Sequence, residues 1–209
     1  MRLMDEIIKL ELLAMEVSDC RLCEAHGMAL NHLPAIHRGD CAPMIVIGTQ
    51  PEKADLHSRQ LFSGSAGKRM MNWLVRAGVG KEVEDVLARI YFTTLSKCHT
   101  ASGRDLNQAI GHCSFFIERE LKLVAPRICV TLGKEPLDRL FRYVGTLEDV
   151  VGGEWTETEL GSHMFPILPD GCRIIPLPKP SSALMWAKDV GRAERLDQAL
   201  VLIDKLFNK

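Results

Sequence analysis

Four of the seven cysteines have the spacing and the neighbours expected of metal ligands. Cys20 and Cys23 form a C-x-x-C pair at the end of an expected helix, a pattern found in redox sites, zinc sites and iron–sulfur sites. Cys98 lies between two polar residues, outside any apolar pattern, and Cys113 follows within the next expected helix. Together the two pairs supply four thiolates, the number that a zinc ion or a [4Fe–4S] cluster requires. The competing interpretation makes Cys98 and Cys113 small core residues, an ordinary role for free cysteine.

The remaining cysteines, Cys41, Cys129 and Cys172, lie in or beside apolar runs and are expected in the core. No apolar run reaches the length of a membrane span, and the first six residues resemble a charged amphipathic helix rather than a signal peptide. We therefore expect a cytoplasmic protein, in which an odd number of cysteines favours metal ligation or free thiols over disulfides. The net charge of −1 gives no global attraction to nucleic acid, so any DNA contact needs a local basic patch.

A second stretch with chemical potential runs from residue 44 to residue 73. An apolar run of strand length, 44–48, leads into a polar loop with a proline, then into the Ser/Gly-rich segment 62–67 and a helical pattern. Open α/β sheets bind ligands where a strand ends in such a loop, and the start of the following helix offers unpaired N–H groups. The alternative is an ordinary strand–helix connection, but long loops inside compact domains are usually functional or disordered.

The elements that must position these residues alternate along the chain. A composition of 46% hydrophobic and 25% charged residues is ordinary for a globular protein with a real core. The alternation predicts one α/β domain over residues 1–209, a three-layer α/β/α arrangement around a mainly parallel four-stranded sheet. Residues 145–171 are less regular and are expected to form a hairpin. The expected strands are 44–48, 90–94, 127–133 and 172–177, and the expected helices are 4–18, 66–77, 81–88, 106–124, 134–143 and 191–207.

Several motifs, in order along the chain, resemble the uracil-DNA glycosylase superfamily, in particular its iron–sulfur type, family 4. Residues 48–52 and 62–67 align without a gap with the family's first motif, normally G-E-A-P-G through P-F-V-G-x-A-G. Residues 124–134 match the family's next strand, and 179–182 occupy its H-P-S loop. The resemblance, which covers most of the chain, implies a [4Fe–4S] cluster that joins remote segments and is structural rather than catalytic. Its implied ligands are Cys20, Cys23, Cys98 and Cys113.

The departures from the family pattern lie in the residues that would contact the base. The motif Glu is Thr49, and the Asn that reads the Watson–Crick edge of uracil is Thr94. Phe62, which the resemblance assigns to stacking on the extruded base, is unchanged. Losing the paired donor and acceptor of an Asn should change or abolish the selection of uracil, and the shorter Thr94 leaves room for a larger base.

Three further residues are the candidates for catalysis under the resemblance. Gln50 stands where related families keep a water-activating Asp or an Asn, and it can only orient a water. Asp55 is then the nearby carboxylate expected to activate that water, although an incidental aspartate is the competing interpretation. Lys179 replaces the loop histidine. It could stabilise an anionic leaving base, form a Schiff base with the sugar, or contact a phosphate.

The loop after the fourth strand is expected to contact DNA. By resemblance, Pro180, Ser181 and Ser182 would hold phosphates while Leu184 or Met185 inserts into the gap left by the flipped base. The alternative places Leu184 in the core.

Taken together, the motifs predict a monomeric DNA glycosylase, with or without lyase activity, retuned from uracil to a modified or damaged base. A bulky pyrimidine of altered viral DNA is one candidate substrate. The rival functions are a non-catalytic protein that binds flipped or abasic nucleotides, and a zinc-stabilised α/β protein without a DNA role.

Overall fold

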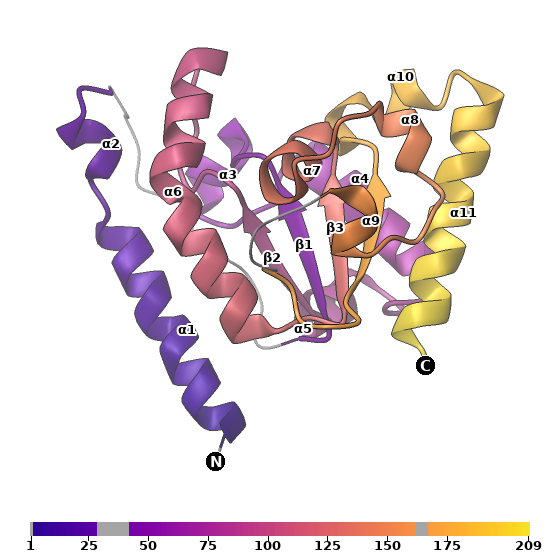
Figure 1. The fold of residues 1–209 in the computed structure, drawn as a ribbon, viewed down its shortest axis with the longest axis horizontal. Helices are drawn as coiled ribbons and strands as arrows, with labels where there is room; N and C mark the ends of the chain where they lie inside the picture. Colours follow the sequence, from indigo (N-terminus) through magenta and orange to yellow (C-terminus); the bar gives the residue numbers. More distant parts are fainter. Residues whose placement is uncertain (1, 29–41, 162–166) are drawn as a thin grey trace.

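The fold is built on a four-stranded sheet whose neighbouring strands are all parallel. A computed structural model describes residues 2–28, 42–161 and 167–209. The strand order is β2-β1-β3-β4, and helices cover both faces, so the predicted three-layer α/β/α class is confirmed (Figure 1). The strands are β1 (Met44–Gly48), β2 (Ile90–Thr94), β3 (Ile128–Leu132) and β4 (Arg173–Leu177).

The strands are apolar runs because both of their faces are covered. Every residue of β1, β2 and β3 is buried. The chain passes from β1 to β2 on one side and then returns to β3 on the other side of β1. This reversal opens a crevice at the carboxyl ends of β1 and β3, where open α/β sheets bind their ligands.

Alternate residues of each strand pack into two separate cores, one on each face of the sheet. The first core contains Val46 and Phe92, and the second contains Ile45 and Tyr91. The helices of the first face are α4 (Ser65–Arg76), α5 (Val83–Arg89) and α11 (Val190–Phe207). Those of the second face are α6 (Gly103–Val124), α7 (Lys134–Phe141), α8 (Leu147–Val150) and α9 (Glu157–Leu160).

The N-terminal helix lies outside these layers. Helix α1 (Arg2–Asp19) runs alongside α6, on the far side from the sheet, and the short α2 (Leu22–Ala25) follows it (Figure 1). Leu13 and Val17 of α1 pack against Phe116 of α6, and an exposed ion pair joins Glu16 to Arg119. This packing brings the C-x-x-C pair next to α6.

Three segments differ from the expectations drawn from the sequence. Residues 145–171 do not form a hairpin in their described part. They contain α8 and α9, each started by a capping box, and a single antiparallel bridge joins Trp155 to Ile174. Two segments expected as loops contain short helices: α3 (Lys53–Ser58), and η1 (Pro180–Ser182) followed by α10 (Ala183–Trp186). Cys41 falls outside the described residues. None of the helices that the structure describes is long and apolar enough to cross a membrane.

Candidate functional site

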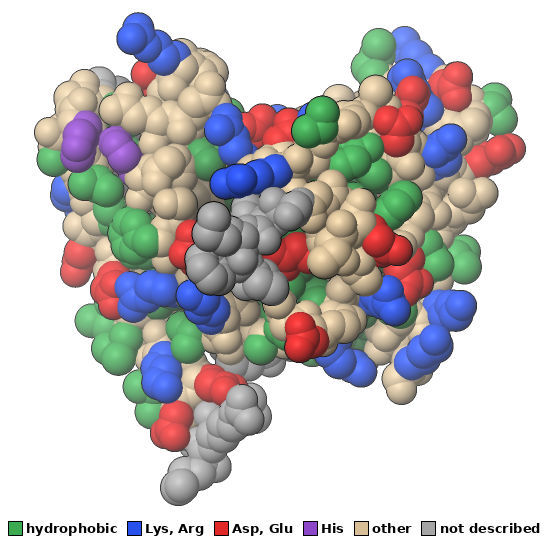
Figure 2. Space-filling view, viewed as in Figure 1, with side chains coloured by type: hydrophobic (Ala, Val, Ile, Leu, Met, Phe, Trp, Pro, Cys, Tyr) green, Lys and Arg blue, Asp and Glu red, His purple; other side chains and the backbone are tan. Residues whose placement is uncertain are grey.

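A cavity of about 420 Å³ lies at the carboxyl ends of β1 and β3, where the topology predicts a ligand site. These strand ends point to the upper edge of the molecule in Figure 1, and Figure 2 shows that edge hollowed between two raised parts. We call this cavity the base pocket. Six residues proposed from the sequence line it: Thr49, Gln50, Asp55, Phe62, Lys179 and Pro180.

Phe62 is held in the pocket wall by an unusual backbone conformation. Its φ of 58° lies in the left-handed region, which bulky residues rarely adopt and which recurs at ligand sites. A Cβ at Gly67 would lie 1.9 Å from the Phe62 carbonyl oxygen, and one at Gly48 would lie 3.1 Å from the ring. Position 67 therefore requires glycine, and a side chain at position 48 would crowd the ring. The ring packs edge-on against Phe92 at 5.8 Å, and its half-exposed side offers a stacking surface for a base.

Asp55 is buried, and three donors occupy its carboxylate. One oxygen accepts from the Ser63 backbone N–H at 2.8 Å and from the Ser63 hydroxyl at 2.9 Å, and the other accepts from the Glu52 N–H at 2.9 Å. These bonds fix the start of α3 and the loop that carries Phe62. The geometry therefore gives Asp55 a positioning role, with its lone pairs turned to the protein rather than to a water.

Gln50 and Thr94 are committed to contacts within the protein. The Gln50 amide oxygen accepts from the Thr100 N–H at 3.0 Å and from its hydroxyl at 2.9 Å. Thr94 is buried, its hydroxyl donates to the Ser96 carbonyl at 2.8 Å, and it lies outside the lining of the base pocket. Its methyl group nevertheless lies beside the pocket wall, because a Cβ at Gly48 would be 3.3 Å from Thr94 Cγ2 and 3.1 Å from the Phe62 ring.

Three titratable residues that the motifs do not single out also line the base pocket: Glu52, Lys53 and His99. Burial raises the pKa of the Glu52 carboxyl, the Asp55 carboxylate raises it further, and the positive charges of Lys179 and His99 oppose the shift. The His99 ring is fixed by Nδ1, which donates to the Pro51 carbonyl at 2.9 Å because a carbonyl can only accept. A signal for Glu52 was present in the sequence: a carboxylate occupies the last position of G-E-A-P-G, where the family has glycine.

The loop after β4 forms one rim of the pocket. Lys179 is exposed there, so its ammonium is hydrated, and the exposed Ser181 and Ser182 follow it. Leu184 is 70% exposed and Met185 is 64% exposed, so the alternative that places Leu184 in the core is wrong. Both side chains project from α10, at the tip expected to enter DNA.

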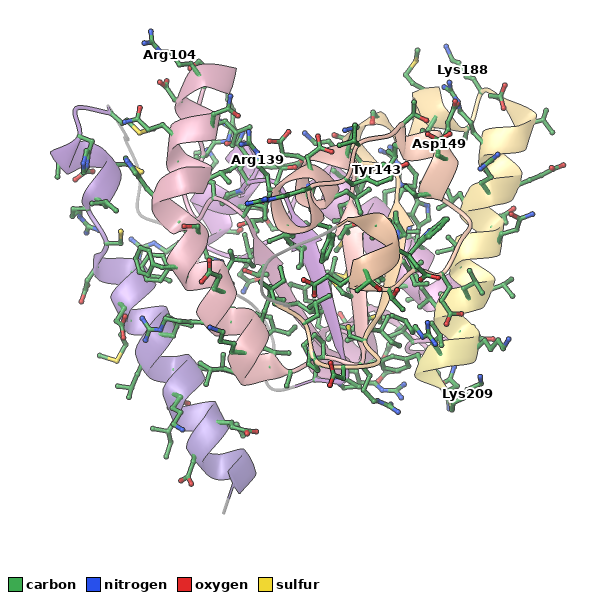
Figure 3. All side chains as sticks on the ribbon, viewed as in Figure 1. Arg104, Arg139, Tyr143, Asp149, Lys188 and Lys209 are labelled. Carbon is green, nitrogen blue, oxygen red and sulfur yellow. The ribbon has the colours of Figure 1, made fainter. Side chains whose placement is uncertain are left out.

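Helix α10, which carries this tip, is held by a hydrogen bond to α11 and has basic side chains on either side. The Trp186 indole N–H donates to the Arg192 carbonyl at 3.0 Å, which holds α10 against the start of α11. Figure 3 shows Arg104 at the top of α6 and Lys188 beside α10, on opposite sides of the molecule's upper edge. The two exposed basic side chains therefore flank the hollow.

The four cysteines proposed as ligands line a second pocket, which we call the cysteine pocket. All four thiols are free, and three of them are buried. Burial raises the pKa of the Cys23 thiol to about 11, with a further contribution from Cys113 and then Cys20. Burial likewise raises the pKa of the Cys98 thiol to about 12, again with repulsion from the other three. Cys23 and Cys98 are therefore expected to become thiolates only beside a compensating cation.

Hydrogen-bond donors also approach the sulfur atoms. The Lys97 backbone N–H donates to Cys113 Sγ at 3.4 Å, and His112 Nδ1 lies 3.4 Å from Cys23 Sγ. Over residues 2–28, 42–161 and 167–209, no three His, Cys, Asp or Glu side chains converge closely enough to hold a single metal ion. Cys129 and Cys172 lie in the core, as expected.

A buried ion pair lies behind the cysteine pocket. Lys97 and Glu120 are 2% and 1% exposed, and the ammonium is 2.6 Å from the carboxylate. The ammonium also donates to the Thr93 hydroxyl at 2.6 Å and to the Thr94 carbonyl at 3.0 Å. All three of its protons are therefore used, as a buried charge requires.

Comparison with known proteins gives the same family as the motifs. The chain is 27% identical to a type-4 uracil-DNA glycosylase of Archaeoglobus fulgidus over 64% of its own length and 61% of that protein's. It is 30% identical to the type-4 enzyme of Saccharolobus solfataricus over 68% of its own length and 64% of the relative's. The matched region thus spans a little under two thirds of these relatives. Residues 38–201 match the family model of the uracil DNA glycosylase superfamily, and the chain belongs to that superfamily.

Proposed function

We propose that this protein is a DNA glycosylase that flips a base into the base pocket and cleaves its N-glycosidic bond. The observation that carries the proposal is the Phe62 ring, held by a left-handed backbone and two glycines at the wall of a cavity of about 420 Å³. That volume falls within the range of small-molecule sites. Strain of this kind persists only where the surrounding structure enforces it, and it concentrates at ligand sites.

We infer that the preferred base is not plain uracil. Uracil selection in the family relies on a carboxamide that pairs with the Watson–Crick edge, whereas the aligned Thr94 has no carboxamide and its hydroxyl is bound to the Ser96 carbonyl. The Gln50 amide is bound to Thr100. Among the polar groups that line the pocket are Glu52, His99 and Lys179, a different set of donors and acceptors. A site built with different polar partners rejects the original base strongly, so a modified or damaged base, such as a bulky pyrimidine, fits the proposal.

The rim of the pocket supports DNA as the partner. The exposed ammonium of Lys179 is suited to stabilise an anionic leaving base or to contact a phosphate. Nucleophilic attack by Lys179 would require a neutral amine, which hydration does not favour. The apolar tip at Leu184 and Met185 is available to fill the space of a flipped base, and Arg104 and Lys188 flank the hollow.

We propose a [4Fe–4S] cluster in the cysteine pocket, held by Cys20, Cys23, Cys98 and Cys113. The donor set fits because four free thiols line one pocket, and the raised pKa values of Cys23 and Cys98 mean that these two thiols need a cationic group to ionise. Zinc, which four thiolates can also hold, is the rival occupant. When bound, the cluster supplies iron–thiolate bonds that tie the α1–α2 segment to the loop after β2 and to α6.

The test uses brown protein purified without oxygen and DNA duplexes that carry uracil, hypoxanthine, 5-hydroxymethyl pyrimidines or glycosylated pyrimidines. Released bases are identified by mass spectrometry, and borohydride traps any covalent adduct. Release of a modified base faster than uracil supports the retuned glycosylase. Release of uracil alone contradicts the change in specificity, and an adduct that disappears in Lys179→Ala would restore the nucleophilic role. Tight binding of abasic DNA without any release would favour a non-catalytic binder.

Sedimentation of the same sample tests the proposal that the chain acts as a single-domain monomer.

A further inference from the structure

Two acidic residues line the described part of the base pocket, Glu52 and Asp55, and their environments differ. Resemblance alone selects Asp55 as the carboxylate that activates water. In the structure, both Asp55 oxygens receive N–H or O–H donors from Glu52 and Ser63. These three hydrogen bonds give the Asp55 carboxylate the task of holding the Phe62 loop in place.

Glu52 differs from Asp55 in its surroundings, although its side chain also takes part in the capping box of α3 by accepting from the Asp55 backbone N–H. It is half-buried at the residue before α3, and its Oε2 reaches toward the start of α4, 3.3 Å from where a Cβ of Gly64 would lie. Lys179 and His99 lie close enough to interact with its charge, which keeps a carboxylate available inside the cavity. Its position between the β1 exit and the helix that follows Phe62 is that of a group facing the bound nucleotide.

We propose that Glu52 is the catalytic carboxylate of this site, the group that accepts a proton from the attacking water. This inference rests on the proposed glycosylase function. In the step, the water oxygen forms a bond to C1′ of the sugar, and the bond between C1′ and the base nitrogen breaks. The bonding electron pair leaves with the base, whose negative charge Lys179 stabilises, and the water proton goes to the Glu52 carboxylate. The base then takes up a proton from solvent.

The surroundings of Glu52 suit this task. Burial and the neighbouring Asp55 carboxylate raise its pKa, while Lys179 and His99 lower it, and the net direction is upward. A carboxylate with a raised pKa is a stronger base at neutral pH than an ordinary glutamate. The family motif has its carboxylate three positions earlier, at the residue that is Thr49 here. In this chain the acidic group has therefore moved to position 52.

The experiment compares Glu52→Gln with two matched variants in single-turnover release of the best substrate. Glutamine keeps a side-chain oxygen that can accept from the Asp55 backbone N–H, so the start of α3 is kept. We expect Glu52→Gln to slow release about 100-fold or more, with abasic-DNA affinity unchanged within about twofold. It should also remove the acidic limb of the pH–rate profile. Glu82→Gln makes the same change at the residue before α5, away from the pocket, and should leave release unchanged. Asp55→Asn should weaken DNA binding through the Phe62 loop and retain the acidic limb.

The outcomes separate this inference from the function on which it rests. A wild-type rate in Glu52→Gln, or an acidic limb that persists there and vanishes in Asp55→Asn, would overturn the assignment while leaving the glycosylase intact. Absence of release from every substrate by the wild-type protein would remove both proposals. A melting temperature of Glu52→Gln at or above that of the wild type shows that a slow rate is not caused by unfolding.

Discussion

The two pockets of this protein differ in how directly residue type reveals their chemistry. In the cysteine pocket, all four thiols that the sequence nominates lie together. Around the base pocket, the Thr94 hydroxyl, Asp55 and Gln50 are hydrogen-bonded to other parts of the chain, and Glu52 and His99, which the motifs do not single out, line the cavity. A thiol has few roles outside metal ligation and packing, whereas a carboxylate or amide takes its role from the donors around it.

The two pockets nevertheless share one short segment, the loop after β2. Cys98 lines the cysteine pocket and the next residue, His99, lines the base pocket. The Ser96 N–H donates to the Thr49 carbonyl at 3.0 Å, and the Ser96 hydroxyl donates to the Cys98 carbonyl at 2.8 Å. Substitutions in the cysteine pocket should therefore also disturb the base pocket. Substitutions around Phe62, which lies on a different loop, should leave the cysteine pocket intact.

The largest effect is expected from removing a cluster ligand. Cys98→Ala should abolish the visible absorbance and lower the free energy of unfolding by at least about 5 kcal/mol, part of the roughly 10–16 kcal/mol that structural zinc sites supply. Cys172→Ala is the matched control, since that thiol is buried in the core, and it should keep the colour. Absorbance and denaturant unfolding measure both. Unchanged visible absorbance in Cys98→Ala would contradict the distinction between ligand cysteines and core cysteines.

The next largest effect concerns the ion pair behind the cysteine pocket. Lys97→Met leaves the Glu120 carboxylate buried without its partner and should destabilise the fold by about 3–5 kcal/mol. The double variant Lys97→Met/Glu120→Leu should recover most of that loss, because an apolar pair replaces the charges. Guanidinium unfolding of both single variants and the double variant measures the coupling. Strictly additive losses would show that the pair does not act as a unit.

The sequence predicts the fold well and the site only in part, for physical reasons visible in these elements. Strands such as β1 are continuous apolar runs because the sheet is buried on both faces, and this signal is local. The roles of Asp55 and Gln50 depend on Ser63 and Thr100, partners fixed only once the loops have folded. The left-handed backbone of Phe62 likewise depends on the space left by Gly67.

A smaller effect, confined to the base pocket, is expected from Phe62→Ala. Loss of one stacking face should weaken binding of a flipped base by about 1–3 kcal/mol, a factor of roughly 5–150 in affinity. Phe115→Ala removes an exposed ring of α6 and serves as the control, with affinity unchanged. Fluorescence titration with duplexes that contain an abasic site or a modified base separates stacking from other DNA contacts. The visible absorbance should persist in both variants, and its loss in Phe62→Ala would contradict the separation of the two pockets.

The smallest expected effect concerns Glu52. It tests whether the base pocket keeps a charged carboxylate that lowers the stability of the fold. Burial and then Asp55 raise the pKa of Glu52 in the folded protein, so the folded state binds this proton more tightly than the unfolded chain does. Above both pKa values the charged Glu52 therefore destabilises the fold, and the protein regains that stability as the pH falls through the folded pKa toward the unfolded one. Glu52→Gln, neutral at every pH, should be modestly more stable than the wild type at pH 7, with the difference shrinking as the pH falls. Thermal unfolding between pH 4 and 8 measures this difference, and Glu82→Gln should show none. A variant that is more stable and yet slower in base release would indicate a carboxylate kept for chemistry, whereas equal stability at all pH values would mean that Glu52 is solvated like an ordinary surface glutamate.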